Sequence, residues 1–368
     1  MASASFTPYL KALTSTPPVF AAVDARASLE IIFTEPVPDV QVAAFLTGLK
    51  LTGLDRDPAI IAAAVDVLQK FSLKVDVAPN GYVDIVGTGG DGKDTFNVST
   101  TSALVAAGAG LRVAKHGNKA STSASGAADV LASLGASIQS VTPVTINQIL
   151  TDSAFAFLFA PVFHPIMAKI APVRKNLGVP TIFNILGPLL NPVPISARII
   201  GVNSPDLGSI FARTLILLDQ KQQHDSSSSS SSSLIVWGEE GLDEISPAGR
   251  TRIWRVRPNS TTVEEGFITP QDFGLQPHDL HSVASGTADQ NSELVRKLVN
   301  NELPTGHAVL DYVLLNSAAL IVISGKANSW KQGVEIARQS IASGQAKIAL
   351  HDFVTATSAA ATLLAGTV

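Results

Sequence analysis

The chain has 368 residues, a length that suits two domains better than one. Hydrophobic residues make up 46% of the sequence and charged residues only 15%, which excludes an intrinsically disordered chain. The net charge of −4 argues against nucleic acid as a partner, and the lack of cysteine excludes disulfides, thiolate nucleophiles and cysteine-ligated zinc.

No targeting or membrane segment is expected from the sequence. The first 15 residues contain neither an apolar core nor an arginine-rich stretch, so we expect no signal or transit peptide. The longest apolar run, Tyr312–Ser324, is shorter than a bilayer span and includes Asn316 and Ser317. The sequence therefore predicts a cytoplasmic protein without a membrane partner.

The first 75 residues are expected to be helical. Apolar residues recur at spacings of three and four in Val40–Leu49 and Ala59–Phe71, and Asp57 followed by Pro58 is typical of a helix start. No strand pattern occurs before Tyr82.

Strands and helices alternate from Tyr82 onwards. The predicted strands are Val83–Val86, Leu111–Ala114, Phe155–Phe159, Arg198–Val202, Leu234–Trp237 and Ile253–Val256. The predicted helices are Thr100–Gly108, Ala127–Leu134, Thr145–Ser153, His164–Ala171 and Leu207–Leu218, with a mostly helical tail from Asn291 to Leu364. Short apolar strands separated by helices predict an α/β fold with a mainly parallel sheet covered on both faces.

One segment is of low complexity. Residues Gln220–Ser233 end in eight consecutive serines and join a predicted helix to a predicted strand. Such a composition buries too little apolar area to offset the entropy of ordering, so we predict a flexible surface loop at 220–233. An inert insertion is the simpler interpretation, and a phosphorylation-controlled switch is the alternative.

A glycine-rich segment, Gly87–Thr95, follows the first predicted strand. Glycines let the backbone turn tightly and bring N–H groups close to an anion, although an ordinary strand-to-helix turn has the same composition. The spacing also matches the dinucleotide-binding fingerprint, but that fold needs an acid at the end of the next strand, where Lys115–Asn118 stand. It matches the P-loop as well, except that Asp94 replaces the Ser or Thr that binds Mg²⁺.

A second polar segment, Lys115–Ser123, offers two ammonium groups, an imidazole, an amide and three hydroxyls. All of these can donate hydrogen bonds to phosphate or carboxylate oxygens. Asn97–Thr100 adds donors at the start of a predicted helix, whose dipole also favours anions. A polar loop with an ordinary helix cap is the alternative explanation.

Three further residue groups are candidates for chemistry. Asp243 and Glu244 follow a strand with no basic residue before Arg250, which suits a hydrated Mg²⁺, or alternatively a solvated acidic turn. Arg174 is the best-placed cation for a substrate carboxylate, with an exposed helix cation as the alternative. His164 has no assigned role, because a histidine before a proline is as readily a cap or a packing residue.

The motifs together resemble the anthranilate phosphoribosyltransferase family. The matching strings are GTGGD at Gly87–Asp91, NVST at Asn97–Thr100, KHGN at Lys115–Asn118, SGAADVLASLG at Ser125–Gly135, FLFAPVFHPIM at Phe157–Met167, PVRKNLGVPTIFNILGPLLNP at Pro172–Pro192 and GLDE at Gly241–Glu244. They occur in family order over most of the chain, from about Leu46 to the C-terminus. Each string alone is weak, and their common order makes the resemblance specific.

The resemblance implies a fold of the nucleoside phosphorylase/phosphoribosyltransferase type. A small helical domain would take residues 1–78 with part of 165–195, and an α/β catalytic domain would take 79–368. The resemblance also implies a homodimer formed through the helical part. The implied reaction is displacement of pyrophosphate from phosphoribosyl pyrophosphate by the amine of anthranilate, a step in tryptophan biosynthesis.

The resemblance also assigns roles to individual residues. Those implied to bind the donor are Gly87, Gly90, Asp91, Thr95, Asn97, Ser99, Thr100, Lys115, Asn118, Lys119, Ser121, Thr122 and Ser123. Mg²⁺ is the implied cofactor, served by Ser99, Asp243 and Glu244, and anthranilate would contact Asn118, Arg174 and His116. Lys115, His116 and Arg174 form the implied catalytic group, in which Mg²⁺, the glycine-loop N–H groups and Lys115 would stabilise the departing pyrophosphate and His116 is a candidate for the amine proton.

Three positions depart from the family pattern. Ala127 stands where many members have a serine that touches the donor, and Ser285–Thr287 is a weakened form of a glycine-rich family string to which no chemistry is attached. The serine run Ser226–Ser233 resembles fungal members more than bacterial ones. Two rival interpretations are a pyrimidine-nucleoside phosphorylase, which shares the fold and related strings, and a non-catalytic nucleotide-sensing protein.

Overall fold

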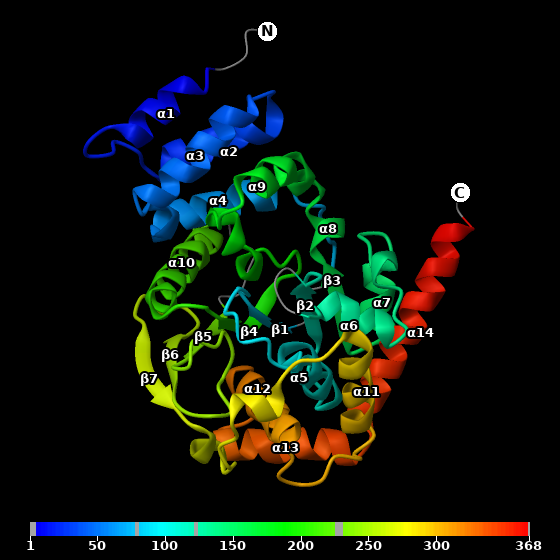
Figure 1. Ribbon diagram of the computed structural model, residues 1–368. Coiled ribbons are helices and arrows are strands. Elements are labelled where there is room, and N and C mark those ends of the chain that lie inside the picture. The colour runs from blue at the N-terminus through cyan, green and yellow to red at the C-terminus, as the bar shows by residue number, and fades with distance from the viewer. Residues whose placement is uncertain (1–4, 78–80, 121–123, 225–230, 367–368) are drawn as a thin grey trace.

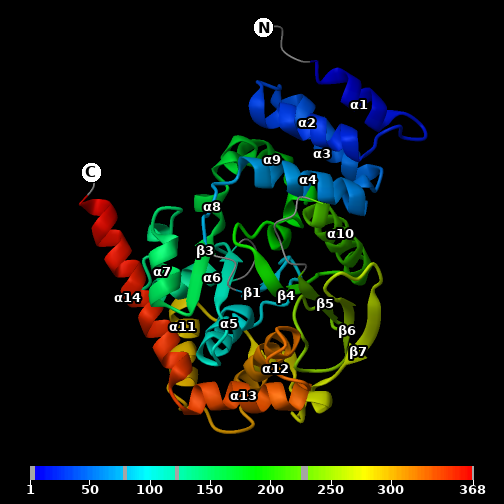
Figure 2. The ribbon, with the colours of Figure 1, turned by 180° about the vertical axis from the view of Figure 1, so that it is seen from behind.

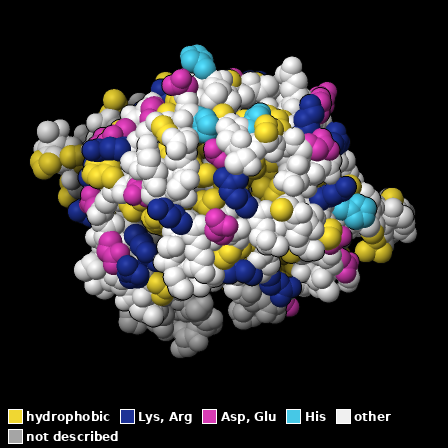
Figure 3. Space-filling view, turned by 90° about the horizontal axis from the view of Figure 1, so that it is seen from below, with side chains coloured by type: hydrophobic (Ala, Val, Ile, Leu, Met, Phe, Trp, Pro, Cys, Tyr) yellow, Lys and Arg dark blue, Asp and Glu magenta, His cyan; other side chains and the backbone are white. Residues whose placement is uncertain are grey.

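The computed structural model of the chain describes residues 5–77, 81–120, 124–224 and 231–366, and for 222–224 it describes the backbone alone. A group of N-terminal helices lies at one end of the molecule, and a sheet surrounded by helices forms the rest (Figure 1). On the face seen in Figure 3, cationic and anionic side chains are interspersed rather than gathered by sign.

Four helices form the N-terminal part: α1 Thr7–Thr14, α2 Ala22–Thr34, α3 Asp39–Leu51 and α4 Pro58–Phe71. Asp57 caps α4, since its Oδ1 accepts from the N–H groups of Ala59 at 2.8 Å and Ile60 at 3.0 Å. Pro58 occupies the first helical turn, where its missing N–H costs nothing. The two helices predicted here are confirmed.

The sheet has seven strands in the order β3-β2-β1-β4-β5-β6-β7. Their bounds are β1 Tyr82–Gly87, β2 Val113–Gly117, β3 Phe155–Phe159, β4 Ile195–Gly201, β5 Ser232–Gly238, β6 Thr251–Val256 and β7 Glu264–Ile268. The first five strands of the order are parallel, and β6 and β7 add antiparallel to one edge. The mainly parallel sheet is confirmed, whereas β7 was not predicted because its residues are largely exposed and include two adjacent glutamates.

Successive residues of β1 point to opposite faces of the sheet and into two apolar cores. Ile85 belongs to the core shared with α5 Val98–Gly108 and α12 Ala308–Ile323. Val86 belongs to the core shared with α10 Pro205–His224 and the N-terminal helices. The remaining longer helices are α6 Ala127–Ser133, α7 Ile146–Asp152, α11 Ala288–Val299, α13 Trp330–Ala342 and α14 Gln345–Ala365. Short 3₁₀ turns are η1 Leu54–Arg56, η2 Ile138–Ser140, η4 Ile182–Asn184, η5 Gly187–Leu189, η6 Pro270–Phe273 and η7 Leu280–Val283.

Within the described residues, α14 alone is long and apolar enough to cross a membrane by length and composition. One face of this helix packs along α5 and α7. The ring of Phe353 is buried there and meets the edge of Phe155 with 4.9 Å between centroids.

The helix predicted at His164–Ala171 is wrong. The chain instead forms α8 Ala160–Phe163, a 3₁₀ turn η3 Pro165–Lys169 and α9 Ala171–Leu177. Pro165 removes an N–H donor and disfavours helical geometry at His164, whose φ and ψ are −123° and 57°. The segment continues toward the N-terminal helices, with α9 beside them (Figure 2). The ring centroids of Phe33 on α2 and Phe183 are 6.3 Å apart there.

The loop predicted at 220–233 is wrong at both of its ends. Gln220 and the residues that follow it to His224 continue helix α10, and Ser232 and Ser233 begin β5. Ser232 pairs with Ala197 and Ser233 with Arg198, because backbone hydrogen bonds to β4 are available whatever the side chain. The residues between 225 and 230 lie outside the described part of the chain.

The second strand ends three residues later than predicted. It runs Val113–Gly117 and includes Lys115 and His116, both of which are buried. Their polar side chains ended the apolar pattern from which the strand was predicted. The shift matters because it places these two residues inside the sheet rather than on a loop.

Candidate active site

The glycine segment turns sharply at the carboxyl end of β1. Gly89, Gly90 and Gly92 have φ angles of +68°, +74° and +68°, a left-handed conformation that residues with a Cβ rarely adopt. The N–H of Gly89 donates to Oδ2 of Asp243 at 2.6 Å. The loop and the acidic pair, 154 residues apart in the sequence, are therefore in direct contact.

Two glycines in register allow Asp243 to lie against the ends of the strands. Gly87 on β1 pairs with Gly201 on β4. A Cβ on Gly87 would lie 2.4 Å from Oδ2 of Asp243, and a Cβ on Gly201 would lie 1.5 Å from its carbonyl oxygen. A larger residue at Gly87 would displace the carboxylate of Asp243, and one at Gly201 would displace its backbone.

Asp243 and Glu244 do not form a solvated acidic turn. Asp243 is only 8% exposed, and burial together with the charge of Asp91 raises its pKa to about 7. Burial, followed by the charge of Asp243, raises the pKa of Glu244 well above its usual value, although Lys115 lowers it. Each carboxyl group thus makes ionisation of the next less favourable.

These carboxyl groups fit a magnesium ion. A divalent cation beside Asp91, Asp243 and Glu244 would offset their mutual repulsion, and hard oxygen ligands are the ones that Mg²⁺ prefers. In the described residues no three His, Asp or Glu side chains converge on one point as a preformed metal cage. That arrangement agrees with Mg²⁺ bound through one or two carboxylates, with water and substrate oxygens as the other ligands.

Lys115 is almost fully buried within β2, at 2% exposure. Its Nζ donates to the carbonyl oxygen of Ile85 at 2.5 Å and to Oγ of Ser99 at 3.3 Å. Burial lowers the pKa of this ammonium group, and the charges of Asp84 and Glu244 partly restore it. The lysine thus connects β1, the start of α5 and the acidic pair.

Two histidines form a buried hydrogen-bonded pair. The Nε2 atoms of His116 and His164 are 3.1 Å apart, Nδ1 of His116 lies 3.1 Å from the carbonyl oxygen of Gly187, and Nδ1 of His164 lies 2.7 Å from Oγ of Ser72. A carbonyl oxygen only accepts, so His116 Nδ1–H donates to Gly187 and its Nε2 accepts from His164. Ser72 donates to the carbonyl oxygen of Leu68 at 2.7 Å and contacts His164, so this histidine connects the end of α4 to His116, a role that the sequence left open.

Burial keeps both rings neutral. It lowers the pKa of His116 to about 3 and that of His164 to about 4. Both nitrogens of His116 are already engaged. The imidazole is therefore a poor acceptor for the proton of an attacking amine.

Asn291, for which the sequence predicted no role, holds the predicted donor-binding residue Asn97 through a hydrogen bond. Nδ2 of Asn291, on α11, lies 2.8 Å from Oδ1 of Asn97, 2.8 Å from Oγ of Ser125 and 3.0 Å from Oγ of Ser285. Its Oδ1 accepts from the N–H of Gly286 at 3.0 Å. The only signal in the sequence was the Ser285–Thr287 string, whose hydrogen bonds to Asn291 depend on the fold.

The other predicted donor-site residues divide into three groups. Thr95 and Thr100 lie against the core, where Oγ1 of Thr95 is 3.5 Å from the hydroxyl of Tyr312 and that of Thr100 is buried without a partner in the described residues. Asn118 and Lys119 are exposed on the loop after β2. Ser121, Thr122 and Ser123 lie outside the described residues.

Arg174 is held on α9 by neighbours from the same segment. Its guanidinium lies 5.7 Å from the ring centre of Phe183, and Nη2 is 3.5 Å from Oδ1 of Asn184. Burial lowers the pKa of this guanidinium, which is nonetheless always charged at physiological pH. None of its described contacts reaches the glycine loop.

Comparison with sequence families gives two matches. Residues 79–347 match the a/b domain of a glycosyl transferase family, and residues 7–72 match the helical bundle domain of a glycosyl transferase family. Over 333 residues the chain is 50% identical to the anthranilate phosphoribosyltransferase of Schizosaccharomyces pombe, covering 90% of this chain and 91% of that protein.

Solved structures give the same result. The anthranilate phosphoribosyltransferase of Saccharomyces cerevisiae in complex with PRPP and Mg is 36% identical, with a TM-score of 0.88 over 96% of this chain and 98% of that one. The same yeast enzyme in complex with 4-fluoroanthranilate gives a TM-score of 0.87 at 34% identity, over 97% and 99% of the two chains. The enzyme of Thermus thermophilus gives 0.84 at 35% identity, over 95% and 99%.

The neutral histidine pair predicts a pH dependence of stability. The unfolded chain binds protons at His116 and His164 below about pH 6.5, whereas the folded chain does so only near pH 3 and 4. Their contribution is therefore complete above pH 6.5 and is lost as the pH falls toward 4. Urea unfolding at pH 5, 6 and 7 should show a steeper loss of the free energy of unfolding for the natural chain than for His116→Asn with His164→Asn.

The comparison with a variant is needed because the raised pKa of Asp243 changes stability in the opposite direction over the same pH range. The exposed His351, replaced by Asn, is the matched control and should leave the slope unchanged. Equal slopes for the natural chain and the double variant would contradict the neutral pair.

Proposed function

Because this chain belongs to the anthranilate phosphoribosyltransferases of the glycosyl transferase family, we propose that it transfers the phosphoribosyl group of phosphoribosyl pyrophosphate to the amine of anthranilate. The products are N-(5-phosphoribosyl)anthranilate and pyrophosphate, in tryptophan biosynthesis. The observation that carries this is the contact of the glycine loop with the buried carboxylate of Asp243, next to Glu244, at the carboxyl ends of parallel strands.

The donor would bind between the glycine loop and the start of α5. Gly87, Gly90 and Asp91 would lie along its pyrophosphate, with Thr95, Asn97, Ser99 and Thr100 at its phosphate oxygens. Asn291 supports this arrangement because it holds the Oδ1 of Asn97, which leaves the Nδ2 of Asn97 to donate to Ser125 and to an anion. Lys119 and Ser121–Ser123 would complete the donor site from the loop after β2.

Asp243 and Glu244 would hold Mg²⁺, with Ser99 close by. When bound, the ion supplies positive charge to the departing pyrophosphate. Lys115 would add a fixed ammonium in a site of low dielectric, where a preorganised charge stabilises a developing anion most strongly. The amine of anthranilate is neutral at pH 7, so the step needs no strong base before attack.

Anthranilate would bind beside Arg174, Asn118 and His116. The guanidinium of Arg174 is suited to the acceptor's carboxylate, since it is oriented by Phe183 and Asn184 and retains free N–H donors. His116 would contact the acceptor as a neutral ring. Its low pKa makes the role of proton acceptor unfavourable.

The quaternary and domain organisation is part of the same proposal. Val19, Val23, Val40 and Leu51, in and around α1–α3, are each at least 70% exposed, which favours a homodimer formed through the N-terminal helices. We assign residues 1–78 with part of 165–195 to a helical domain, residues 79–368 to a catalytic domain, and the protein to the cytoplasm.

A single assay tests the function. Purified protein should release pyrophosphate from the donor only when both Mg²⁺ and anthranilate are present. Release of a base from pyrimidine nucleosides in phosphate buffer would instead identify a phosphorylase. Donor binding without any turnover would identify a nucleotide sensor.

Replacing both acids tests the metal site. Asp243→Asn with Glu244→Gln should lower kcat by about 10²-fold or more, the usual scale for loss of an electrostatic contact made in the transition state. The Mg²⁺ midpoint should rise, because neutral oxygens are weaker ligands. The measurement is a Mg²⁺ titration of initial rate at saturating substrates, with circular dichroism as the folding control. An unchanged kcat and midpoint in a folded variant would remove these residues from the metal site.

Replacing Arg174 tests the acceptor site. Arg174→Ala should raise the KM for anthranilate far more than that for the donor, because loss of a charge-assisted hydrogen bond costs about 1.5–3 kcal/mol. Lys175→Ala, an exposed cation on the same helix, is the matched control and should change neither KM. Equal rises in both KM values for Arg174→Ala would assign the residue to structure.

A further inference from the structure

The face of the sheet that α10 covers changes character along the strands. At one level, Val86, Ile200 and Ile235 are in register on β1, β4 and β5 and belong to one apolar core. Two residues nearer the amino ends, the same face carries Asp84, Arg198 and Ser233, which are also in register with one another. A buried sheet thus carries a transverse row of an acid, a guanidinium and a hydroxyl.

This polar row is incompletely paired. Asn191 donates through Nδ2 to Oδ2 of Asp84 at 2.8 Å, and Nη2 of Arg198 reaches Oγ of Ser231 only at the 3.5 Å limit. In the described part of the chain, Nε of Arg198 and Oδ1 of Asp84 are buried without any hydrogen-bond partner. A guanidinium has five N–H donors, and a buried N–H group without a partner is costly.

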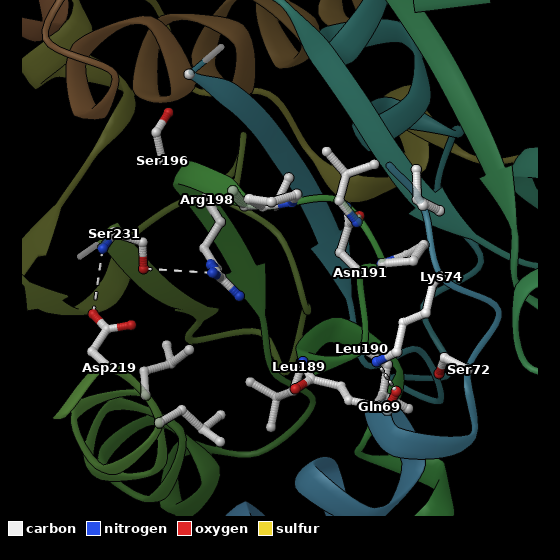
Figure 4. A pocket seen from close by; sticks show the side chains of 18 of the residues that line it. Gln69, Ser72, Lys74, Leu189, Leu190, Asn191, Ser196, Arg198, Asp219 and Ser231 are labelled. Carbon is white, nitrogen blue, oxygen red and sulfur yellow. Dashed lines mark hydrogen bonds between the residues drawn. The ribbon is translucent and has the colours of Figure 1, made fainter. Parts of the chain in front are cut away.

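A cavity of about 390 Å³ lies in front of Arg198. Its walls come from the end of α4, the connection to β1, residues 189–196 and the second half of α10. Figure 4 shows the guanidinium projecting from β4 into this space, between Asn191 on one side and Asp219 with Ser231 on the other. The volume is within the range of about 300–1,000 Å³ typical of small-molecule sites.

The cavity is separate from the proposed catalytic site. It is lined by residues at the amino ends of β4 and β5, such as Ser196 and Ser231, whereas the glycine loop follows the carboxyl end of β1. In parallel strands all amino ends lie on one side of the sheet and all carboxyl ends on the opposite side. None of the residues assigned above to donor, metal or acceptor lines the cavity.

The lining indicates the kind of ligand. Its ionisable side chains are Lys74 and Arg198, which are cationic, and Asp219, which is anionic. Asp84 lies beside Arg198 in the sheet as a second acid, so a ligand with more than one negative charge is disfavoured. Leu189, Leu190, Leu215 and Leu218 provide apolar walls. A planar carboxylate matches the guanidinium fork, and a short apolar body matches the leucines.

We propose that this cavity is a second ligand site, which binds a small organic carboxylate through Arg198. The carboxylate accepts from the unpaired N–H groups of Arg198, Lys74 adds long-range attraction at the rim, and the apolar body lies among the leucines. Ser72 also lines the cavity, and its hydroxyl contacts His164. Ser72 would therefore be the residue between an occupant of the cavity and the histidine pair.

The test is a titration of the full-length protein with hexanoate labelled with ¹³C at the carboxylate, followed by NMR. Saturable binding should persist in Arg174→Ala, which removes the proposed acceptor clamp, and should weaken at least tenfold in Arg198→Gln, as expected for loss of a charge-assisted hydrogen bond. Arg198→Gln should retain catalytic turnover within about twofold, which also shows that it folds. Hexanol, which lacks the carboxylate, should not bind.

A surface variant keeps the test decisive if Arg198→Gln does not fold. Lys74→Glu at the rim should weaken hexanoate binding, whereas Lys347→Glu, the same charge change on exposed α14, should not. Absence of saturable binding to the natural chain, or binding lost in Arg174→Ala and kept in Arg198→Gln, would overturn the proposal. Displacement of hexanoate by inorganic phosphate with equal affinity would overturn the assignment to carboxylates.

Discussion

The contact of Asp243 with the paired glycines Gly87 and Gly201 is the constraint on which the structure at the carboxyl ends of the parallel strands depends. A Cβ at either glycine would collide with the acid, so two strand ends are kept bare for a residue that comes from the turn after β5. Once Asp243 lies there, its carboxylate accepts the N–H of Gly89 and orients the glycine loop. The positive φ angles of that loop are what allow the N–H to point inward.

Burial then sets the chemistry at the same strand ends. Asp243 and Lys115 are buried and Glu244 is partly buried, and burial displaces the pKa values of all three toward the neutral forms. Such an arrangement costs stability in the empty protein and is relieved by a cation and a polyanion bound together. On the proposed function, metal and pyrophosphate bound here would offset this unpaired charge, which is the condition under which electrostatic stabilisation of a leaving group is strongest.

Much of this could be predicted from the sequence, and the failures have physical causes. The order of strands and helices followed from apolar patterns, since five parallel strands buried on both faces give short runs such as Phe155–Phe159. The pattern ended β2 too early because Lys115 and His116 are polar residues inside a strand, and it missed Ser232 and Ser233 for the same reason. Long-range partners such as Asn291, or the pairing of His116 with His164, depend on which segments the fold brings together, and local composition does not contain that information.

The carboxyl ends and the amino ends of the parallel strands both carry buried polar residues, but the two sets suit different ligands. At the carboxyl ends, helix starts, turns and glycines surround the polar residues with donors, so a highly charged ligand can be held by many groups at once. At the amino ends, the row of Asp84, Arg198 and Ser233 lies near the leucines of α10 and near Asn191, Asp219 and Ser231. A site of that kind cannot neutralise a polyanion, because it has one guanidinium at its base and an acid beside it. It is suited to a ligand with a single charge and an apolar body, and the chemical difference between the two ends follows from what packs over each end of the same strands.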